Sequence, residues 1–318
     1  MKLDFVSVGE VMIQFNAMTP GPLRTVSTFE KHVAGSEANV MAGLSRLGHR
    51  TGMITRVGKD EFGSAILGAL KAEDVDTSHV TVDPSSPTGI YFTQRHFPVP
   101  GESVLTYYRK GSAASNLDEA DIDTDYIKGA KNIHITGITP ALSVSCARAV
   151  WKAFQFAREN GLGTSFDTNV RPKLWKDTAT ARGALSNYLT SKVVLTNGED
   201  LGLLFPGLGM KDAVAEVLRK GAEVVAVKLA SAGAYARSGT EEAEAPAFHV
   251  PHVEDVIGAG DAFDAAFLSS YLKSTALREC LEHGCAAGAL VVTVRGDMEA
   301  LPRREDLEAF LTSKRWVS

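Results

Sequence analysis

The chain has 318 residues, of which 44% are hydrophobic and 22% are charged, and its formal net charge at pH 7 is −5. This length and composition are ordinary for a water-soluble globular enzyme with a sizeable core. The mildly acidic balance weakly disfavours a nucleic-acid-binding protein, which normally carries a basic patch.

The three cysteines, Cys146, Cys280 and Cys285, are odd in number and lack CxxC spacing. This pattern argues against a disulfide framework and against a zinc site, so we expect reduced, structural thiols. The stretch "MKLDFVSVGE" has no basic segment followed by an apolar one, and no later stretch is apolar enough to span a membrane. We therefore expect a cytoplasmic protein with neither a membrane nor a nucleic acid as a partner.

Strand-like and helix-like segments alternate along most of the chain. Strands are predicted at residues 5–9, 51–58, 132–137, 163–169, 191–197 and 223–229. Helices are predicted at 36–47, 60–74, 143–160, 210–221, 259–272 and 276–294, with Ser36 as the cap of the first and Gly48 as its stop. This alternation predicts an α/β fold with a doubly wound, mostly parallel sheet.

Two β-rich segments interrupt the alternation. Val11–Val33 is strand-like and rich in turn residues, and Thr88–Arg109 contains two β-rich runs joined by "PVPGE", which predicts a hairpin. Together they could form a small β-subdomain that covers a site and excludes water. The alternative is an ordinary hairpin at the edge of the main sheet, and the pattern alone does not decide between the two.

The segment "DVIGAGDAFDAAF" places Gly258, Ala259 and Gly260 just before an amphipathic run, at the expected start of a helix. The free N–H groups and the dipole at a helix start favour an anion, and glycine lets the backbone approach a phosphate closely. Asp261 is then either an ordinary acidic residue of a first helical turn or a base placed to take a proton from an attacking hydroxyl. The string matches neither of the common nucleotide motifs, GxxxxGK[ST] and GxGxxG.

Further polar residues stand next to predicted strands or helix starts, and each also has a purely structural interpretation. Asp167, Asn169 and Arg171 alternate at a strand end, where ligands of open α/β sheets bind. Tyr107 and Arg109 share one face of a strand and suit a polyhydroxylated acid, unless they are simply a solvated edge. The remaining candidates are Gly35 and Asn39 at a helix start, Asn197 and Glu199 after a strand, with Glu199 able to hold Mg²⁺ through water, and the turn with Lys228, Ser231 and Gly233.

The order and spacing of these segments resemble the ribokinase (PfkB) family of sugar kinases. "AGSEANVMAGLSRLG…RVGKDEFG" is similar to the first signature of that family, and "DVIGAGDAFDAAF" is similar to the second. "YYRKGSAASNL" and "FDTNVRPKLW" look like the branch that phosphorylates 2-keto-3-deoxygluconate. The resemblance covers essentially the whole chain, as one domain of residues 1–318 with a β-sheet lid formed by residues 11–33 and 88–110.

This resemblance implies transfer of the γ-phosphoryl group of ATP to the primary hydroxyl of a 2-keto-3-deoxy sugar acid. Asp261 would be the base, and the backbone of Gly258, Ala259 and Gly260 would form the anion hole. It further implies Mg²⁺ near Glu199, a monovalent cation such as K⁺ as a further candidate, and a homo-oligomer formed through the lid. The implied sugar-binding residues are Gly35, Asn39, Tyr91, Tyr107, Arg109 and Arg171, and the implied ATP-binding residues are Asn169, Asn197, Lys228, Ser231, Gly233, Gly258, Gly260 and Cys285.

The sequence departs from the family pattern at several positions. Val256 stands where Thr is usual, Ala266 and Ala230 replace glycines, and Cys285 stands where Asn is frequent. Gln14 is neutral where neutral-sugar kinases carry an acid, which suits an acidic substrate. The alternatives are a kinase of fructose, ribose or 2-keto-3-deoxygalactonate and, in another class, a catalytically silent sugar or nucleotide sensor. The absence of GxGxxG after the first strand disfavours a dehydrogenase.

Overall fold

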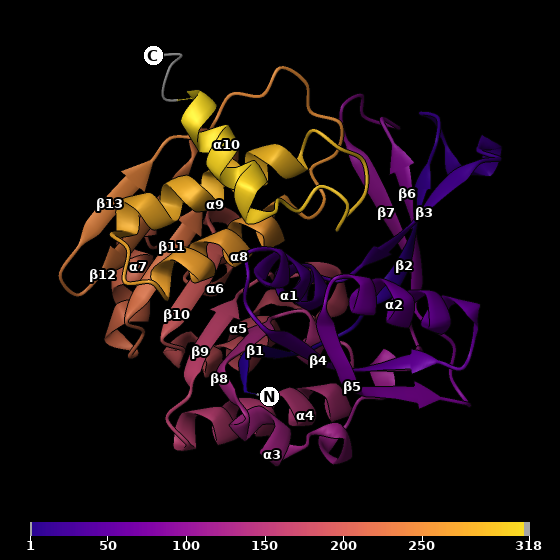
Figure 1. The fold of residues 1–318 in the computed structure, drawn as a ribbon, viewed down its shortest axis with the longest axis horizontal. Helices are drawn as coiled ribbons and strands as arrows, with labels where there is room; N and C mark the ends of the chain where they lie inside the picture. The colour runs from indigo at the N-terminus through magenta and orange to yellow at the C-terminus, as the bar shows by residue number, and fades with distance from the viewer. Residues whose placement is uncertain (1, 315–318) are drawn as a thin grey trace.

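The computed structural model describes residues 2–314, which form two sheets with helices packed around the larger one (Figure 1). The main sheet has the order β13-β12-β11-β10-β9-β8-β1-β4-β5. Its strands are β1 (Leu3–Val8), β4 (Thr51–Gly58), β5 (Val75–Asp83), β8 (Ala130–Thr136), β9 (Gly163–Asp167), β10 (Val193–Asn197), β11 (Val224–Lys228), β12 (Ala234–Ser238) and β13 (Glu242–Ala245). Pairing is parallel from β5 to β11 and antiparallel at β12 and β13. The predicted doubly wound, mostly parallel sheet is confirmed.

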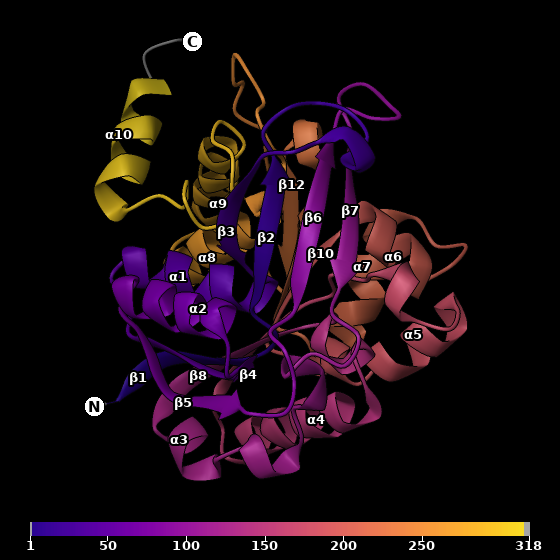
Figure 2. The same ribbon diagram turned by 90° about the vertical axis from the view of Figure 1, so that its right-hand side faces the viewer.

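Alternating strand side chains feed two separate hydrophobic cores, one on each face of the main sheet. In β11, Val224 and Ala226 join one core, and Val225 and Val227 join the other. Helices of the first core are α1 (Ser36–Arg46), α2 (Glu61–Ala72), α8 (Ala259–Tyr271), α9 (Leu277–Val291) and α10 (Arg304–Lys314). The opposite face is covered by α3 (Thr124–Lys128), α4 (Val144–Glu159), α5 (Thr178–Leu185), α6 (Gly198–Leu204) and α7 (Met210–Arg219), as Figure 2 shows.

The two β-rich segments form a second sheet of their own, with the order β3-β2-β6-β7. Its strands are β2 (Met12–Ala17), β3 (Phe29–Ala34), β6 (Ile90–Arg95) and β7 (Ser103–Tyr108). β6 and β7 pair antiparallel as the predicted hairpin, and β2 joins the two segments by pairing parallel with β6. The interpretation as a small β-subdomain is therefore correct, and the edge hairpin of the main sheet is not. This small sheet stands upright beside the main sheet in Figure 2.

Local capping explains where several helices begin. The side chain of Asp60 accepts a hydrogen bond from Gly63 N at the start of α2, and that of Ser143 accepts one from Cys146 N at the start of α4. No helix within residues 2–314 is long and apolar enough to cross a membrane. Cys146, Cys280 and Cys285 are all free thiols, as predicted.

Candidate active site

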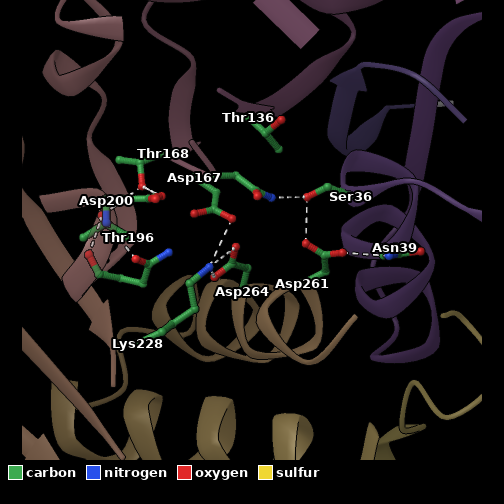
Figure 3. A network of polar contacts seen from close by, with 12 residues as sticks. Ser36, Asn39, Thr136, Asp167, Thr168, Thr196, Asp200, Lys228, Asp261 and Asp264 are labelled. Atoms are coloured by element: carbon green, nitrogen blue, oxygen red, sulfur yellow. Dashed lines mark hydrogen bonds and ion pairs between the residues drawn. The ribbon is translucent and has the colours of Figure 1, made fainter. Parts of the chain in front are cut away.

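The carboxyl ends of β9, β10 and β11 bring together polar residues that are far apart in the sequence. In the parallel register Leu195 lies opposite Asp167, and Asn197 lies opposite Lys228. Asp261, at the start of α8, faces the same edge of the sheet (Figure 3). Because ligands of open α/β sheets bind beyond this edge, these residues define the candidate active site.

Asp261, in the first turn of α8, is held by two side chains of α1. Ser36 Oγ donates to Asp261 Oδ1 and Asn39 Nδ2 donates to Oδ2, each at 2.7 Å. Asn169 Nδ2 in turn donates to Ser36 Oγ at 2.8 Å. Burial raises the pKa of the Asp261 carboxyl group above its ordinary value, and the two hydrogen bonds oppose that rise. A carboxylate that is fixed in place and more basic than usual is suited to accept a proton.

The prediction that Ser36 caps α1 is wrong. The residue before the helix is Gly35, and no side chain caps this end. Ser36 is the first helical residue, and its hydroxyl turns toward Asp261 instead. The competing partner is a carboxylate that lies 225 positions away in the sequence, so the local pattern could not reveal it.

Two glycines let the backbone segments around Asp261 pack closely. Gly35 has φ of +153°, and a Cβ there would lie 2.5 Å from the carbonyl oxygen of Glu10. Gly258 has φ of +79°, and a Cβ there would lie 2.7 Å from Asp297 Oδ1. Both positions therefore require glycine. The first N–H groups of α8, which follows Gly258, have no intrahelical acceptor and form a cradle that suits an anion.

Lys228, at the end of β11, forms a buried ion cluster with two carboxylates. Its Nζ lies 3.1 Å from Asp167 Oδ2 and 2.9 Å from Asp264 Oδ1. Burial opposes the charge on Lys228, but the two carboxylates outweigh this effect and raise the pKa of the ammonium group. A Cβ at Gly260 would lie 3.6 Å from Nζ, so the cation lies beside the first turn of α8. Asp264 was not predicted from the sequence, although residues three apart on one helix, such as Asp261 and Asp264, are neighbours.

Asn197 and Asp200 connect the ends of β9 and β10. Asn197 Oδ1 accepts the backbone N–H of Asp200 at 2.8 Å and so caps α6. Asp200 is buried and accepts from Thr168 Oγ1 at 2.6 Å and from the backbone N–H of Val170 at 3.0 Å. Glu199, which lies between them, is exposed. Glu199 was predicted from the sequence and Asp200 was not, although Asp200 stands three residues after Asn197, at the position whose backbone N–H a capping side chain binds.

Asn39 and Tyr91 converge on Asp297, a third carboxylate that the sequence did not reveal. Asn39 Nδ2 donates to Asp297 Oδ1 at 2.6 Å, and the Tyr91 hydroxyl lies 3.4 Å from Oδ2. Burial and the nearby charge of Asp261 raise the pKa of the Asp297 carboxyl group well above its ordinary value. The Tyr91 and Tyr107 rings lie 5.1 Å apart. The predicted Gly35, Asn39, Tyr91 and Tyr107 are thus brought together.

The two predicted arginines lie in different environments. Arg109 is partly buried and ion-paired with Glu10, and its Nε donates to Glu10 Oε2 at 2.7 Å. Its guanidinium carbon lies 5.2 Å from the centre of the Tyr107 ring. Arg171 is exposed and forms no ion pair within the described part of the chain. Its charge is nevertheless close enough to Tyr107 to oppose the rise that burial causes in the pKa of that hydroxyl.

Ser231 and Gly233 lie in the turn of the β11–β12 hairpin. Lys228 pairs with Ala234 across this hairpin, so the turn begins at the candidate site. Ser231 is exposed. Cys285, on α9, is partly buried against the hydrophobic core, and burial raises the pKa of its thiol to about 12, which keeps it neutral.

The residues present fit a phosphorylated ligand with Mg²⁺. Asp167 Oδ1 and Asn39 Oδ1 are buried at the site without a hydrogen-bond partner among the described residues, and the turn at Gly258 has no room for a side chain. Within residues 2–314, no three His, Cys, Asp or Glu side chains are grouped so that they could hold a metal ion. Mg²⁺ bound to a nucleotide needs only one or two protein carboxylates, because water and phosphate oxygens complete its shell.

Comparisons with known proteins agree with this geometry. A model of the pfkB family of carbohydrate kinases matches residues 2–304. The chain is 47% identical over 311 residues to 2-dehydro-3-deoxygluconokinase of Thermoproteus tenax, covering 97% of this chain and 94% of that protein. It is 40% identical over 319 residues to 2-dehydro-3-deoxygluconokinase of Bacillus subtilis (strain 168), covering 100% of this chain and 98% of that protein.

Solved structures show the same relationship. A putative ribokinase II from E. coli, solved in complex with ATP and Mg²⁺, has a TM-score of 0.91 at 28% identity. The match covers 98% of this chain and 99% of that one. The resemblance seen in the sequence motifs is confirmed, and this chain belongs to the pfkB family of carbohydrate kinases.

Proposed function

We propose that this protein transfers the γ-phosphoryl group of ATP to the primary hydroxyl of a 2-keto-3-deoxy sugar acid, converting 2-keto-3-deoxygluconate to its 6-phosphate. The observation that carries the proposal is the Asp261 carboxylate, held by Ser36 and Asn39 immediately after the turn of small residues. The relatives at 47% and 40% identity carry the name 2-dehydro-3-deoxygluconokinase, which denotes a kinase of the same compound.

In the proposed mechanism Asp261 accepts the proton of the attacking hydroxyl while the new O–P bond forms. The bond between the γ-phosphorus and the ADP oxygen breaks, and the electron pair leaves with ADP. The backbone N–H groups of Gly258, Ala259 and Gly260 would stabilise the charge on the transferring group, with the Lys228 cation behind them. Phosphoryl transfer requires such positioning and charge stabilisation more than covalent participation of the protein.

The sugar acid would lie on the side of the site nearest the small sheet. Gly35 and Asn39 would face its hydroxyls, and the rings of Tyr91 and Tyr107 would pack on its carbons. Arg109 and Arg171 would bind its carboxylate, since a guanidinium group pairs with a carboxylate through two parallel hydrogen bonds.

The nucleotide would lie along the strand ends and the hairpin turn. Glu199 would hold Mg²⁺ through water, and this ion would supply positive charge against the phosphates of the nucleotide, with K⁺ as a further candidate ion. The residues proposed to contact ATP are Asn169, Asn197, Lys228, Ser231, Gly233, Gly258, Gly260 and Cys285.

We also propose that the chain acts as one domain in which residues 11–33 and 88–110 form a lid over the sugar. Val104 and Tyr108 are exposed on the outermost strand of the small sheet, and an exposed edge strand can pair with a second chain. A homo-oligomer formed through this lid, acting in the cytoplasm, is the proposed working state. Its dissociation by Tyr108→Asp, measured by light scattering, tests the assembly.

A coupled ADP-release assay across sugar acids and neutral sugars, each with the same ATP concentration, tests the proposed substrate. We expect kcat/KM for 2-keto-3-deoxygluconate to exceed that for fructose or ribose by at least about ten-fold, or about 1.4 kcal/mol. A neutral sugar that wins by this margin refutes the proposal in favour of another kinase of the same fold. The galactonate-derived acid belongs in the panel, because it differs only in stereochemistry. If no sugar is turned over, the remaining alternative is a catalytically silent sugar or nucleotide sensor.

Arg171→Ala provides the matching test of the carboxylate site. Because this side chain is exposed and has no ion pair within the described residues, its loss should leave folding intact. We expect KM to rise by about ten-fold or more for the sugar acid and to change little for a neutral sugar. Equal changes for both substrates would show that the guanidinium group does not bind the carboxylate.

A further inference from the structure

Glu10 is a buried carboxylate at the candidate site to which the proposed mechanism gives no role. It follows β1 and is only 2% exposed. Its two oxygens have different partners: Oε2 accepts from Arg109, and Oε1 accepts from Ser112 Oγ at 2.7 Å. A buried carboxylate with both oxygens engaged is held in one orientation, and so is the arginine that it binds.

Glu10 also lies where the two sheets are joined. The chain passes four times between the main body and the small sheet: before β2, after β3, before β6 and after β7. Glu10 belongs to the first connection, and its carbonyl oxygen lies against Gly35 in the second. Its Oε1 lies against Gly89 in the third, where a Cβ would be 2.8 Å away, and its side chain binds Arg109 and Ser112 in the fourth. Glu10 therefore belongs to one of the four connections and contacts the other three.

The ion pair between Glu10 and Arg109 leaves the Nη1 group of Arg109 available to bind a ligand. Nε and Nη2 both face Glu10 Oε2, whereas Nη1 donates no hydrogen bond to any residue within the described chain. The guanidinium group presents its donors in a rigid plane, so fixing one edge fixes the direction of the rest. The Tyr107 ring, 5.2 Å from the guanidinium carbon, provides one neighbour to that plane.

The charges of the two arginines are used differently. The Glu10–Arg109 pair is neutral as a unit, so its contribution to an anionic ligand is mainly the geometry of the free Nη1. Arg171 has no paired carboxylate within the described residues and carries its full charge at the surface of the site. Arg109 thus contributes hydrogen-bond donors in a fixed orientation, and Arg171 contributes positive charge.

We propose that Glu10 is a positioning residue that determines specificity for acidic sugars, by holding Arg109 so that its free donors face the carboxylate of the substrate. This inference rests on the proposed function, because it needs a sugar acid as the substrate. It adds that selectivity depends on a residue that does not itself touch the sugar, and that the same contact ties the carboxylate-binding arginine to the connections of the small sheet.

The test compares kcat and KM for 2-keto-3-deoxygluconate and for fructose in the wild type and in Glu10→Gln and Glu10→Asp. Gln keeps the size of the side chain and removes its charge, whereas Asp keeps the charge and withdraws the carboxylate by one methylene. If Glu10 acts by orientation, both variants raise KM for the acid by about ten-fold and change kcat less than about three-fold. The ratio of kcat/KM for acid over fructose then falls about ten-fold in both.

Other outcomes overturn the inference. A lower KM for the acid in Glu10→Gln would mean that Glu10 only masks the charge of Arg109. Wild-type behaviour of Glu10→Asp would mean that charge alone matters, and an unchanged ratio in both variants would mean that Glu10 is purely structural. Failure of the proposed function is separate, since it appears as a wild type that does not prefer the acid.

Two further variants serve as a control and as a replacement for Glu10→Gln. Glu73→Gln is the matched control, because Glu73 forms a partly buried pair with Arg46 away from the site, and it should leave the acid-to-fructose ratio unchanged. Ser112→Ala replaces Glu10→Gln if that variant does not fold. It frees Glu10 Oε1 while keeping the carboxylate, and we expect a smaller fall in the ratio, about two- to five-fold, again through KM. No change in Ser112→Ala with a folded protein would contradict the inference.

Discussion

Two carboxylates on α8, one turn apart, are held in opposite ways. Within the described residues, Asp261 accepts side-chain hydrogen bonds only from the neutral groups of Ser36 and Asn39. Asp264 is completely buried and paired with the Lys228 cation. Neutral donors fix the orientation of a carboxylate without giving it a permanent counter-charge, so it can still take up a proton. The Lys228 cation favours the ionised form of Asp264, but burial and the charge of Asp167 outweigh it and raise the pKa of that carboxyl group well above its ordinary value.

The two centres also act on each other. The charge of Asp167 raises the pKa of the Asp261 carboxyl group, and the charge of Lys228 lowers it. The effect of Asp167 is the larger of the two, so the two charges together raise the pKa of Asp261. The ion cluster therefore favours a basic Asp261, while its own carboxylates have a cation as partner. This difference predicts that substitutions at Asp261 change catalysis with little effect on stability, whereas substitutions in the cluster also change stability.

The largest expected effect is the loss of turnover in Asp261→Asn, which tests the catalytic role of this carboxylate apart from stability. Asp261→Asn should lower kcat by about 10² to 10⁴-fold, because the amide cannot accept the proton of the attacking hydroxyl. Its carbonyl oxygen can still accept one of the two hydrogen bonds, so the unfolding free energy and ATP binding should change little. Steady-state ADP release, urea unfolding and ATP titration measure the three quantities. Turnover near that of the wild type would rule out Asp261 as the base.

Lys228→Met should lower stability as well as weaken the proposed binding of ATP. It leaves Asp167 and Asp264 buried without their cation, and removal of one partner of a buried pair costs about 3 to 5 kcal/mol. Lys228→Met/Asp264→Asn removes one of the stranded charges and should recover part of that loss. Urea unfolding of the three proteins measures both steps. If the double variant is no more stable than the single one, the two carboxylates are not competing for the same cation.

Glu37 extends the comparison, because it is a fully buried carboxylate held by neutral groups alone. Thr136 and Thr139 donate to its Oε1 at 2.7 Å. Burial raises the pKa of Glu37 to about 7, and these hydrogen bonds oppose the rise. The folded protein therefore binds a proton more tightly than the unfolded chain does, so this contribution is complete below about pH 4.5 and is lost as the pH rises toward 7.

Glu37→Gln should remove that pH dependence. Over this range the wild type should lose about 3 kcal/mol of unfolding free energy from Glu37, since one pKa unit corresponds to about 1.4 kcal/mol. The variant should show a correspondingly flatter profile when urea unfolding is measured from pH 4.5 to 8. An identical slope in both proteins would mean that Glu37 does not titrate in this window.

The fold was largely predictable because its signals are local. Buried parallel strands such as 224–227 are runs of apolar residues, and the helices between them have apolar stripes. The edge strand β5, "VDTSHVTVD", was missed because most of its side chains are not buried and no apolar run marks it. The strand β13 and the helices α5 and α6 were missed because they have only 4, 8 and 7 residues, too few for a periodic apolar pattern to stand out.

The residues of the candidate site could be predicted from local pattern only where they stand together in one segment of the chain. Gly258 and Asp261 stand together in the chain, so the turn and the acid could be recognised. Glu10 and Asp297 could not, because their partners come from remote segments: Glu10 meets Arg109 99 positions later, and Asp297 meets Asn39 across 258 positions. The sequence around a single acidic residue does not indicate which hydrogen-bond donors will lie beside it in the folded protein.

The smallest effect concerns one hydrogen bond of Asp261. Ser36→Ala removes the donor to Oδ1 but leaves Asn39 on Oδ2. A hydrogen bond to the charged form lowers a pKa, so its loss should raise the pKa of Asp261 further, by about 0.7 units for about 1 kcal/mol. Because the base must be ionised, the acidic limb of the kcat–pH profile should move to higher pH by that amount. Ser64→Ala, which removes an exposed helix hydroxyl outside the site, is the control. An acidic limb that does not move would show that Ser36 orients Asp261 without tuning its basicity.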